Sequence, residues 1–279
     1  MSIEKIVKTG LLASALVSVV VLIAVVVYVF ANGIPAITPE FLLTPPYRFE
    51  YGGIFPQIIG SLCLVAICLL FAVPLGVSSA IYLAEYAPDN LLTKSVRFFV
   101  ECLAGIPSIV IGLFGLIFLV HHLKLGVSML SGGIALGFMI LPWTVRASEE
   151  AIKSVPRSYR EASLALGASK WQTIRYVVLK SAYPGIITGV LLGMGKAIGE
   201  TAVVLLTAGS GLESFLPRSA FDPTASLPVY IYMLATQGHT AEAFSRAFGA
   251  SSVLITMFLM ISLFALYIRN KYIRKMAGG

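Results

Sequence analysis

The sequence predicts an all-α polytopic membrane protein with six transmembrane helices, and three observations support this class. Hydrophobic residues occupy 58% of the 279 positions and charged residues only 12%, which is far from the composition of soluble domains. The mean hydropathy is +0.91. Several apolar runs reach the roughly 20 residues that a helix needs to cross the hydrocarbon core of a bilayer.

Six apolar segments are separated by polar stretches or by stretches rich in glycine and proline. Lys5 and Lys8 precede the first segment, as they would in a secretory signal, but the segment lacks a clear small-residue cleavage site. We therefore expect a retained membrane anchor. Pro74 is expected to bend the second segment. The predicted transmembrane segments are 11–31, 56–83, 97–120, 130–145, 184–208 and 251–268.

The chain divides into three predicted parts. Residues 1–55 form an N-terminal transmembrane helix and an outer loop. Residues 56–268 form a core of five transmembrane helices, which contains a charged loop at 148–183 and an outer loop at 210–250. Residues 269–279 form a basic tail.

The outer loop of the core carries two signals for short helices. Ser226 followed by Pro228 can start a helix that ends near Gly238, and Thr240 can cap another that ends near Gly249.

The basic residues are distributed unevenly between the two sides of the predicted membrane domain. Six spans place both termini on one side, and that side holds fifteen of the 20 lysines and arginines, whereas the opposite side holds four. Because basic residues gather in cytoplasmic loops, both termini and the 148–183 loop are predicted to be cytoplasmic. The net charge of +7 has the same explanation and needs no nucleic-acid partner.

The 148–183 loop contains the signals of two short helices separated by a glycine corner. Ser158 and Glu161 have the spacing of a capping box, in which each side chain satisfies the other residue's amide. The first helix would end at Gly167, since glycine best tolerates a left-handed conformation. Ser169 and Gln172 form a second capping box. A pair of capped helices at this position suggests a docking element.

Lys196 is the most informative single charge, because it lies near the middle of the predicted fifth span, where charged side chains are costly and mark functional sites. Glu200 follows four residues later, on the same face of a continuous helix. Gly185, Gly189 and Gly193 share that face and would let a neighbouring helix approach closely. Two interpretations remain open: the charges line a polar pathway, or they form a pair that only fixes helix register.

No residue set indicates catalysis or a metal site. The three cysteines lie in or beside apolar segments, and their spacing matches neither a disulfide framework nor metal ligands. The three histidines have no ligand partners nearby in sequence. Gly195-Lys196 lacks the earlier glycine of a phosphate-binding loop, so any ATP chemistry belongs to a partner. Glu101 is explained by an i,i+4 pair with Arg97.

The charged loop contains Glu161-Ala162-Ser163, then Gly167 after three further residues, and then Val177-x-Leu179. This pattern resembles the EAA loop of bacterial ABC-importer permeases. Ser163 stands where that pattern has a second alanine, and Lys180 stands where it has a proline.

Within that family, the likeness extends to PstA-type permeases of high-affinity phosphate importers. It rests on Leu103–Val110, Gly112–Gly115, Ala197–Thr201 and Ser226–Tyr232, and it covers residues 56 to the end. That group usually has arginine where this chain has Lys196. An arginine guanidinium could hold phosphate through two hydrogen bonds, whereas the lysine ammonium is a point charge.

The resemblance implies a type I ABC-importer permease architecture in a bacterial plasma (inner) membrane. It also implies a heterodimer with a second homologous permease, two copies of an ATPase subunit that uses ATP and Mg, and an extracytoplasmic phosphate-binding protein. The chain itself would bind no cofactor and catalyse no reaction. The expected ATPase-coupling residues are Ser158, Glu161, Ala162, Ser163, Gly167 and Ser169.

The expected function is therefore the transmembrane subunit of an ATP-driven phosphate importer, with Lys196 and Glu200 along the path. One alternative keeps the ABC permease but changes the cargo to another oxyanion, such as molybdate or sulfate. The other is an ion-coupled secondary anion carrier in which Lys196 and Glu200 form a relay.

Overall fold

The computed structural model describes residues 3–47, 51–210 and 215–276. Within them, five helices are long and apolar enough to cross a membrane, and a bent pair of shorter helices makes a sixth span if its halves count as one. The five long helices are α1 (Ile3–Gly33), α3 (Phe55–Ile81), α6 (Met129–Lys153), α9 (Leu179–Ile198) and α12 (Ala241–Met276).

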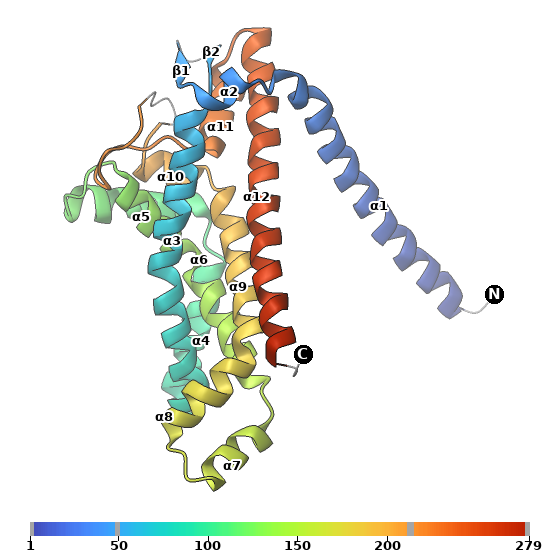
Figure 1. The fold of residues 1–279 in the computed structure, drawn as a ribbon, viewed down its shortest axis with the longest axis vertical. Coiled ribbons are helices and arrows are strands. Elements are labelled where there is room, and N and C mark those ends of the chain that lie inside the picture. Colours follow the sequence, from blue (N-terminus) through green and yellow to red (C-terminus); the bar gives the residue numbers. More distant parts are fainter. Residues whose placement is uncertain (1–2, 48–50, 211–214, 277–279) are drawn as a thin grey trace.

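Shorter elements connect the long helices (Figure 1). The shorter α-helices are α2 (Pro39–Leu43), α4 (Leu91–Ala104), α5 (Ser108–Gly115), α7 (Arg157–Ala165), α8 (Lys170–Thr173), α10 (Ala202–Thr207) and α11 (Leu227–Gln237). The remaining short helical elements are the 3-10 helix η1 (Ile34–Ala36) and the π-helices η2 (Tyr82–Tyr86), η3 (Leu116–His122) and η4 (Ile174–Val178). Strand β1 (Pro46–Tyr47) pairs antiparallel with β2 (Tyr51–Gly52).

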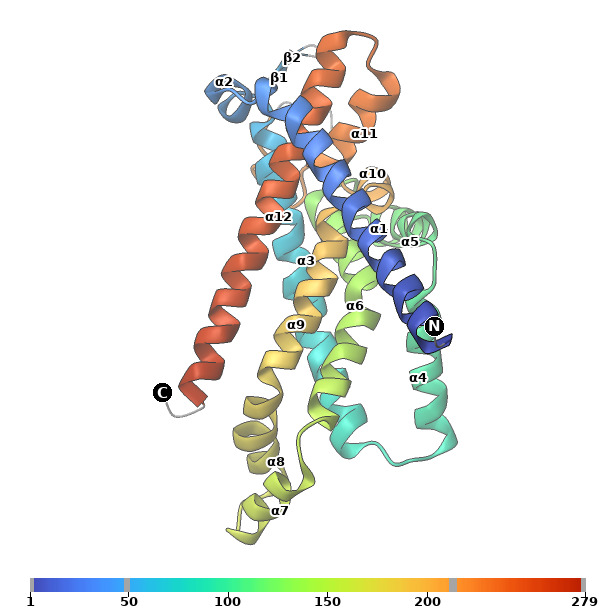
Figure 2. The same cartoon turned by 90° about the vertical axis from the view of Figure 1, so that its right-hand side faces the viewer.

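The centre of the molecule is a bundle in which α6 packs against α3 on one side and α9 on the other. Leu64 and Cys68 of α3 and Leu136, Met139 and Ile140 of α6 are fully buried in one cluster between them. Helices α7 and α8 project from one end of this bundle, and α11 and the β1–β2 hairpin lie at the opposite end (Figures 1 and 2).

Helix α1 diverges from the bundle (Figure 1). Its most hydrophobic stretch buries none of its residues, and it is joined to α12 near its C-terminal end, where the Ser252 hydroxyl donates to the Val29 carbonyl at 3.3 Å. A helix that is apolar all round is suited to a lipid or protein environment rather than water.

The predicted third span, 97–120, is wrong as a continuous helix. Helices α4 and α5 meet at an angle of 99°, and residues 105–107 separate them. Pro107 has extended backbone angles (φ −57°, ψ 137°), and a proline disfavours helical geometry in the residue before it. The chain therefore turns at this point instead of continuing across the bundle.

The predicted fifth span, 184–208, is also wrong as one helix. Helix α9 starts earlier, includes Pro184, and ends at Ile198, and α10 is a separate helix. Gly199 is the C-terminal cap of α9, consistent with the low helix propensity of glycine.

In the outer loop, the first predicted short helix is confirmed and the second is wrong. Ser226 caps α11 by accepting from the Val229 amide, and α11 ends before Gly238. Thr240 does accept from the Ala243 amide, but the helix that follows runs on without a break through Gly249 to the end of α12. A Cβ at Gly249 would lie 3.1–3.2 Å from Ala36 and Phe41, so this glycine permits close packing and does not end a helix. The same helix includes most of the predicted tail.

Helices α6 and α9 approach closely at Gly189, where a Cβ would overlap the Cβ of Ala147. We expect Gly189→Ala to lower the free energy of unfolding by about 1–3 kcal/mol, because overpacking a tight contact forces backbone shifts. The measurement is thermal unfolding of the purified protein in mild detergent.

Two matched variants make this prediction specific. Adding Ala147→Gly to Gly189→Ala removes the overlapping methyl group and should recover much of the lost stability. Gly10→Ala, at a helical glycine with nothing within 4 Å of its added Cβ, should have little effect. An equal loss at both glycines would contradict the packing explanation.

Candidate functional site

The exposed corner made by α7 and α8 is the first candidate site. None of the α7 residues is buried, and Tyr159, Leu164 and Leu166 have exposed fractions of 52%, 49% and 89%. Exposed apolar side chains gathered on one projecting element are typical of a protein-binding surface.

The predicted capping box at Ser158 is wrong. Helix α7 begins at Arg157 after Pro156, and no side chain caps it, so Ser158 is its second helical residue. An extended Pro156 (φ −56°, ψ 140°) fixes the chain direction and starts the helix two residues earlier than the Ser158 spacing suggested. Glu161 is consequently exposed on the helix, and its carboxylate is not needed for capping.

The glycine corner has the geometry that the sequence predicted. Gly167 adopts φ +85°, its amide donates to the Leu164 carbonyl at 2.9 Å, and the Ala168 amide donates to the Ser163 carbonyl at 3.2 Å. This pair of bonds is a Schellman motif, which satisfies the last carbonyls of a helix. The corner is therefore fixed by its backbone.

Helix α8 begins with the predicted capping box at Ser169, which is confirmed. The Gln172 amide donates to the Ser169 hydroxyl at 3.3 Å, and the Ser169 amide donates to Gln172 Oε1 at 2.7 Å. A hydrogen bond of 2.9 Å between the hydroxyls of Ser163 and Thr173 joins α7 to α8. Ser163, the residue that departs from the alanine pattern, thus links the two helices, while Ala162 is exposed.

The second candidate site surrounds Lys196. Lys196 lies in the last turn of α9 rather than mid-helix, its side chain is exposed, and its Nζ lies 5.3 Å from the centre of the Trp143 ring of α6. A cation over an indole face is an attractive arrangement. Trp143, itself 46% exposed, has no local sequence signal that would have associated it with Lys196.

Glu200 does not share a helix face with Lys196. It lies in the break between α9 and α10, beside a small cavity that Ser61 and Ser226 also line. In the described part of the chain, Lys196 and Glu200 form no ion pair. The predicted i,i+4 geometry is therefore wrong, because Gly199 ends the helix first.

Three of the four glycines of α9, Gly185, Gly189 and Gly193, face α6. A Cβ on Gly185 would lie 2.7 Å from the Cβ of Ala151, and one on Gly193 would lie 3.5 Å from Ile140. Together with Gly189, they form a smooth strip along which α9 contacts α6.

Glu101 is paired differently from the prediction. Its carboxylate lies 2.6 Å from Arg146 Nη2 of α6, whereas Arg97 donates through Nε to Glu149 at 2.8 Å. Glu149 also pairs with Lys153 at 2.6 Å. The partners of Arg97 and Glu101 are on another helix, so neighbouring positions in the sequence could not identify them.

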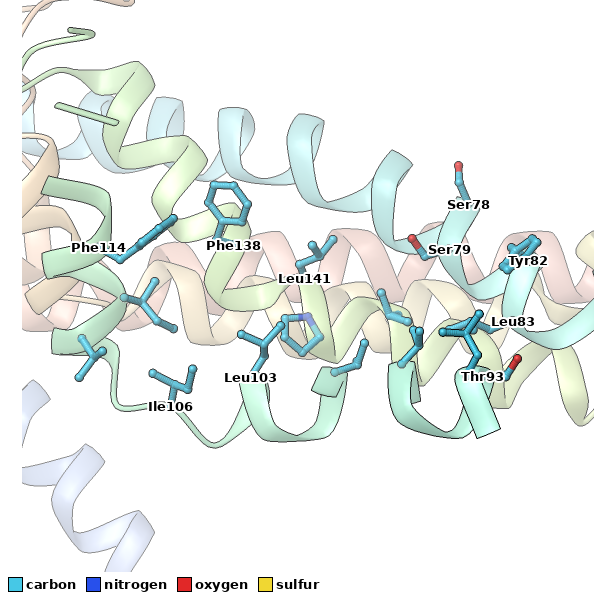
Figure 3. A pocket seen from close by; sticks show the side chains of 17 residues that line it. Ser78, Ser79, Tyr82, Leu83, Thr93, Leu103, Ile106, Phe114, Phe138 and Leu141 are labelled. Carbon is cyan, nitrogen blue, oxygen red and sulfur yellow. The ribbon is translucent and has the colours of Figure 1, made fainter. Parts of the chain in front are cut away.

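A large apolar groove of about 880 Å³ lies between α3, α4, α5 and α6. Phe114 and Phe138 lie toward one end, and Tyr82, Leu83 and Thr93 lie toward the other (Figure 3). The described residues that line it include hydroxyl groups but no charged side chain. A hydrated anion would find no cation there, which favours the Lys196 face as the polar site.

Comparison with known proteins identifies the family. Residues 72–267 match the family model described as "Binding-protein-dependent transport system inner membrane component". The chain is 36% identical to the probable ABC transporter permease protein YqgI of Bacillus subtilis, over 93% of this chain and 92% of that one. It is 37% identical to the phosphate transport system permease protein PstA of Pasteurella multocida, over 84% and 82% of the two chains.

Solved structures show the same fold. A bacterial ABC transporter involved in the import of alginate matches with a TM-score of 0.67 at 16% identity, covering 96% of this chain and 98% of that one. The MetNI methionine ABC transporter in an inward-facing conformation matches with a TM-score of 0.60 at 18% identity, covering 80% and 96%. The predicted type I importer fold is thereby confirmed, and the chain belongs to the binding-protein-dependent transport system inner membrane components, as a permease subunit of an ABC importer.

Proposed function

We propose that this chain forms half of the membrane path of an ATP-driven importer of inorganic phosphate. The observation that carries the substrate is the similarity to proteins named as phosphate permeases, over most of both chains. Besides the Pasteurella protein, the probable phosphate permease PstA of Methanocaldococcus jannaschii is 33% identical over 89% of this chain.

The α7–α8 corner is the proposed contact with the ATPase subunits, of which two copies would bind ATP and Mg. Three features support this role: the corner projects from the bundle (Figure 2), Gly167 and Ser169 fix its backbone, and the Glu161 carboxylate is exposed. Ser158, Ala162 and Ser163 complete the proposed surface. The chain itself would hold no nucleotide and perform no catalysis.

Lys196 is the proposed anion contact in the path. Its exposed cation lies beside Trp143, on a face that a second permease would cover in a complete transporter. Glu200, beyond the end of α9, is proposed to lie further along the same path and to weaken anion binding enough for release. Gly185, Gly189 and Gly193 keep the same side of α9 packed against α6.

The second permease is proposed to be a related chain rather than another copy of this one. Two permeases of a single organism, YqgI and YqgH of Bacillus subtilis, are 36% and 35% identical to this chain over more than nine-tenths of its length. A pair of related permeases in one cell is what a heterodimer requires. The exposed apolar helix α1 would then contact lipid or that partner.

The orientation follows from the distribution of basic residues, which favours a cytoplasmic location for the α7–α8 corner and both termini. The α11 end would then face outward in the bacterial inner membrane and receive an extracytoplasmic phosphate-binding protein.

Reconstitution of the chain with its second permease, ATPase and binding protein in vesicles tests the function. Radiolabelled phosphate should accumulate only when ATP is supplied on the side of the membrane that carries the ATPase. Excess unlabelled sulfate or molybdate should not reduce this accumulation. Competition by either oxyanion would reassign the cargo. Uptake by the purified chain alone under an ion gradient would select the secondary-carrier alternative.

A further inference from the structure

The π-helical turn η2 at the end of α3 is contacted by cations from three other helices. Arg97 comes from α4, Arg160 from α7 and Lys170 from α8. Two of these helices form the exposed corner. Single π-turns within or beside α-helices occur frequently at functional sites, so this convergence suggests a mechanical role.

Arg160 makes the most extensive of these contacts. Its Nε and Nη2 donate to Glu85 Oε1 of η2 at 3.0 and 2.7 Å. Its Nη1 donates to the Val155 carbonyl at 2.6 Å, and Nη2 also donates to the Ile152 carbonyl at 2.9 Å. The side chains of Arg160 and Glu85 are only 20% and 9% exposed. One guanidinium thus joins α7 to the ends of both α3 and α6.

The neighbouring cations strengthen the same junction. Arg97 Nη2 donates to the Leu83 carbonyl of η2 at 2.9 Å, while its Nε reaches Glu149 of α6. Lys170 Nζ lies 4.5 Å from the centre of the Tyr86 ring, also in η2. Helices α4, α6, α7 and α8 therefore all connect to one five-residue turn.

The physical consequence is that these contacts resist a shift of α7 relative to α3 and α6. A guanidinium holds its donors in a rigid planar fork, and removing one partner of a mostly buried ion pair leaves the other charge uncompensated. In contrast, the side-chain bond from Ser163 to Thr173 is a neutral contact that stays within the corner itself.

We propose that Arg160, acting through Glu85, is the positioning residue that transmits displacement of α7 to the transmembrane helices α3 and α6. This inference rests on the proposed function, because it assumes that the α7–α8 corner contacts the ATPase. It assigns to Arg160 a role distinct from docking, since its guanidinium points into the chain's own bundle.

The test measures phosphate transported per ATP hydrolysed by the reconstituted complex. Arg160→Ala should lower this ratio by about three- to thirtyfold, the range expected when a residue in a coupling network is lost. Arg160→Lys should give a smaller reduction, because an ammonium can keep the pair with Glu85 but cannot reproduce the planar fork. Co-purification of the ATPase should remain normal in both variants.

The matched control is Lys94→Ala, which breaks the exposed pair with Asp89 (3.4 Å, side chains 64% and 79% exposed) and should leave the ratio unchanged. If Arg160→Ala fails to assemble, Glu85→Gln removes the partner's charge with little change of shape and should still lower the ratio. An unchanged ratio in an assembled Arg160→Ala or Glu85→Gln complex overturns the inference. Absence of phosphate uptake in the wild-type complex would instead reject the proposed function.

Discussion

Replacement of Gly167 by valine is expected to reduce phosphate uptake by at least about tenfold while the permease still inserts and folds. Gly167 has φ +85°, and a non-glycine residue held in that region costs of order 1–3 kcal/mol. An added Cβ would meet nothing within 4 Å, so the effect comes from backbone conformation alone. We expect the corner to relax away from its Schellman geometry, which would misplace the α7 surface that we propose contacts the ATPase.

The measurement compares uptake, ATP hydrolysis and thermal stability of the assembled transporter. ATP hydrolysis should persist without matching transport, and the bundle should melt near the wild-type temperature because Gly167 lies in the exposed corner.

Two variants separate docking from general strain. Gly167→Asn should keep substantial uptake, because asparagine tolerates the left-handed region better than other side chains. Gly126→Val introduces the same kind of strain at another glycine with φ +69° and open space around it, but between η3 and α6 rather than in the corner. Normal uptake with Gly167→Val would remove the docking role of the corner.

The local features of this corner could be predicted from the sequence because each depends on a few adjacent residues. The Gly167 corner and the Ser169–Gln172 capping box require only hydrogen bonds between residues within two turns, and both occur as expected. The apolar runs likewise indicated where long helices lie, since a membrane-length helix needs only a sufficient number of apolar side chains.

Predictions that depended on competition between neighbouring signals were less successful. At Ser158, the preceding proline sets the start of α7. Gly249 lies inside a helix, where it packs tightly against Ala36 and Phe41. The sequence showed only that glycine has a low helix propensity, which favoured a helix end. A glycine ends α9 at position 199 but does not end α12, and only the surroundings distinguish the two cases.

Contacts between distant residues could not be predicted at all. Arg97 and Glu149 are 52 positions apart, and Arg160 and Glu85 are 75 apart. Local charge spacing instead suggested a pair between Arg97 and Glu101, which does not form in the described chain. The ion pair that joins α7 to η2 and the one that joins α4 to α6 therefore became visible only with the fold.

Lys196 gives the second large expected effect. Lys196→Met should lower phosphate uptake by at least about tenfold, because it removes the cation that we propose attracts the anion. Stability should stay the same or rise, since a charged side chain within a membrane-spanning segment is unfavourable. The favourable contact with Trp143 offsets only about 0.5–2 kcal/mol of that cost.

Lys196→Arg and a distant control test what the cation does. Arginine offers phosphate a bidentate fork, so Lys196→Arg should retain uptake and lower the KM for phosphate uptake. Lys271→Ala removes an exposed cation at the end of α12 and should leave uptake unchanged. If Lys196 only fixes helix register, Lys196→Met should instead lower the unfolding temperature and leave KM unaltered, and the path would have to be assigned to other residues of the exposed α6 and α9 face.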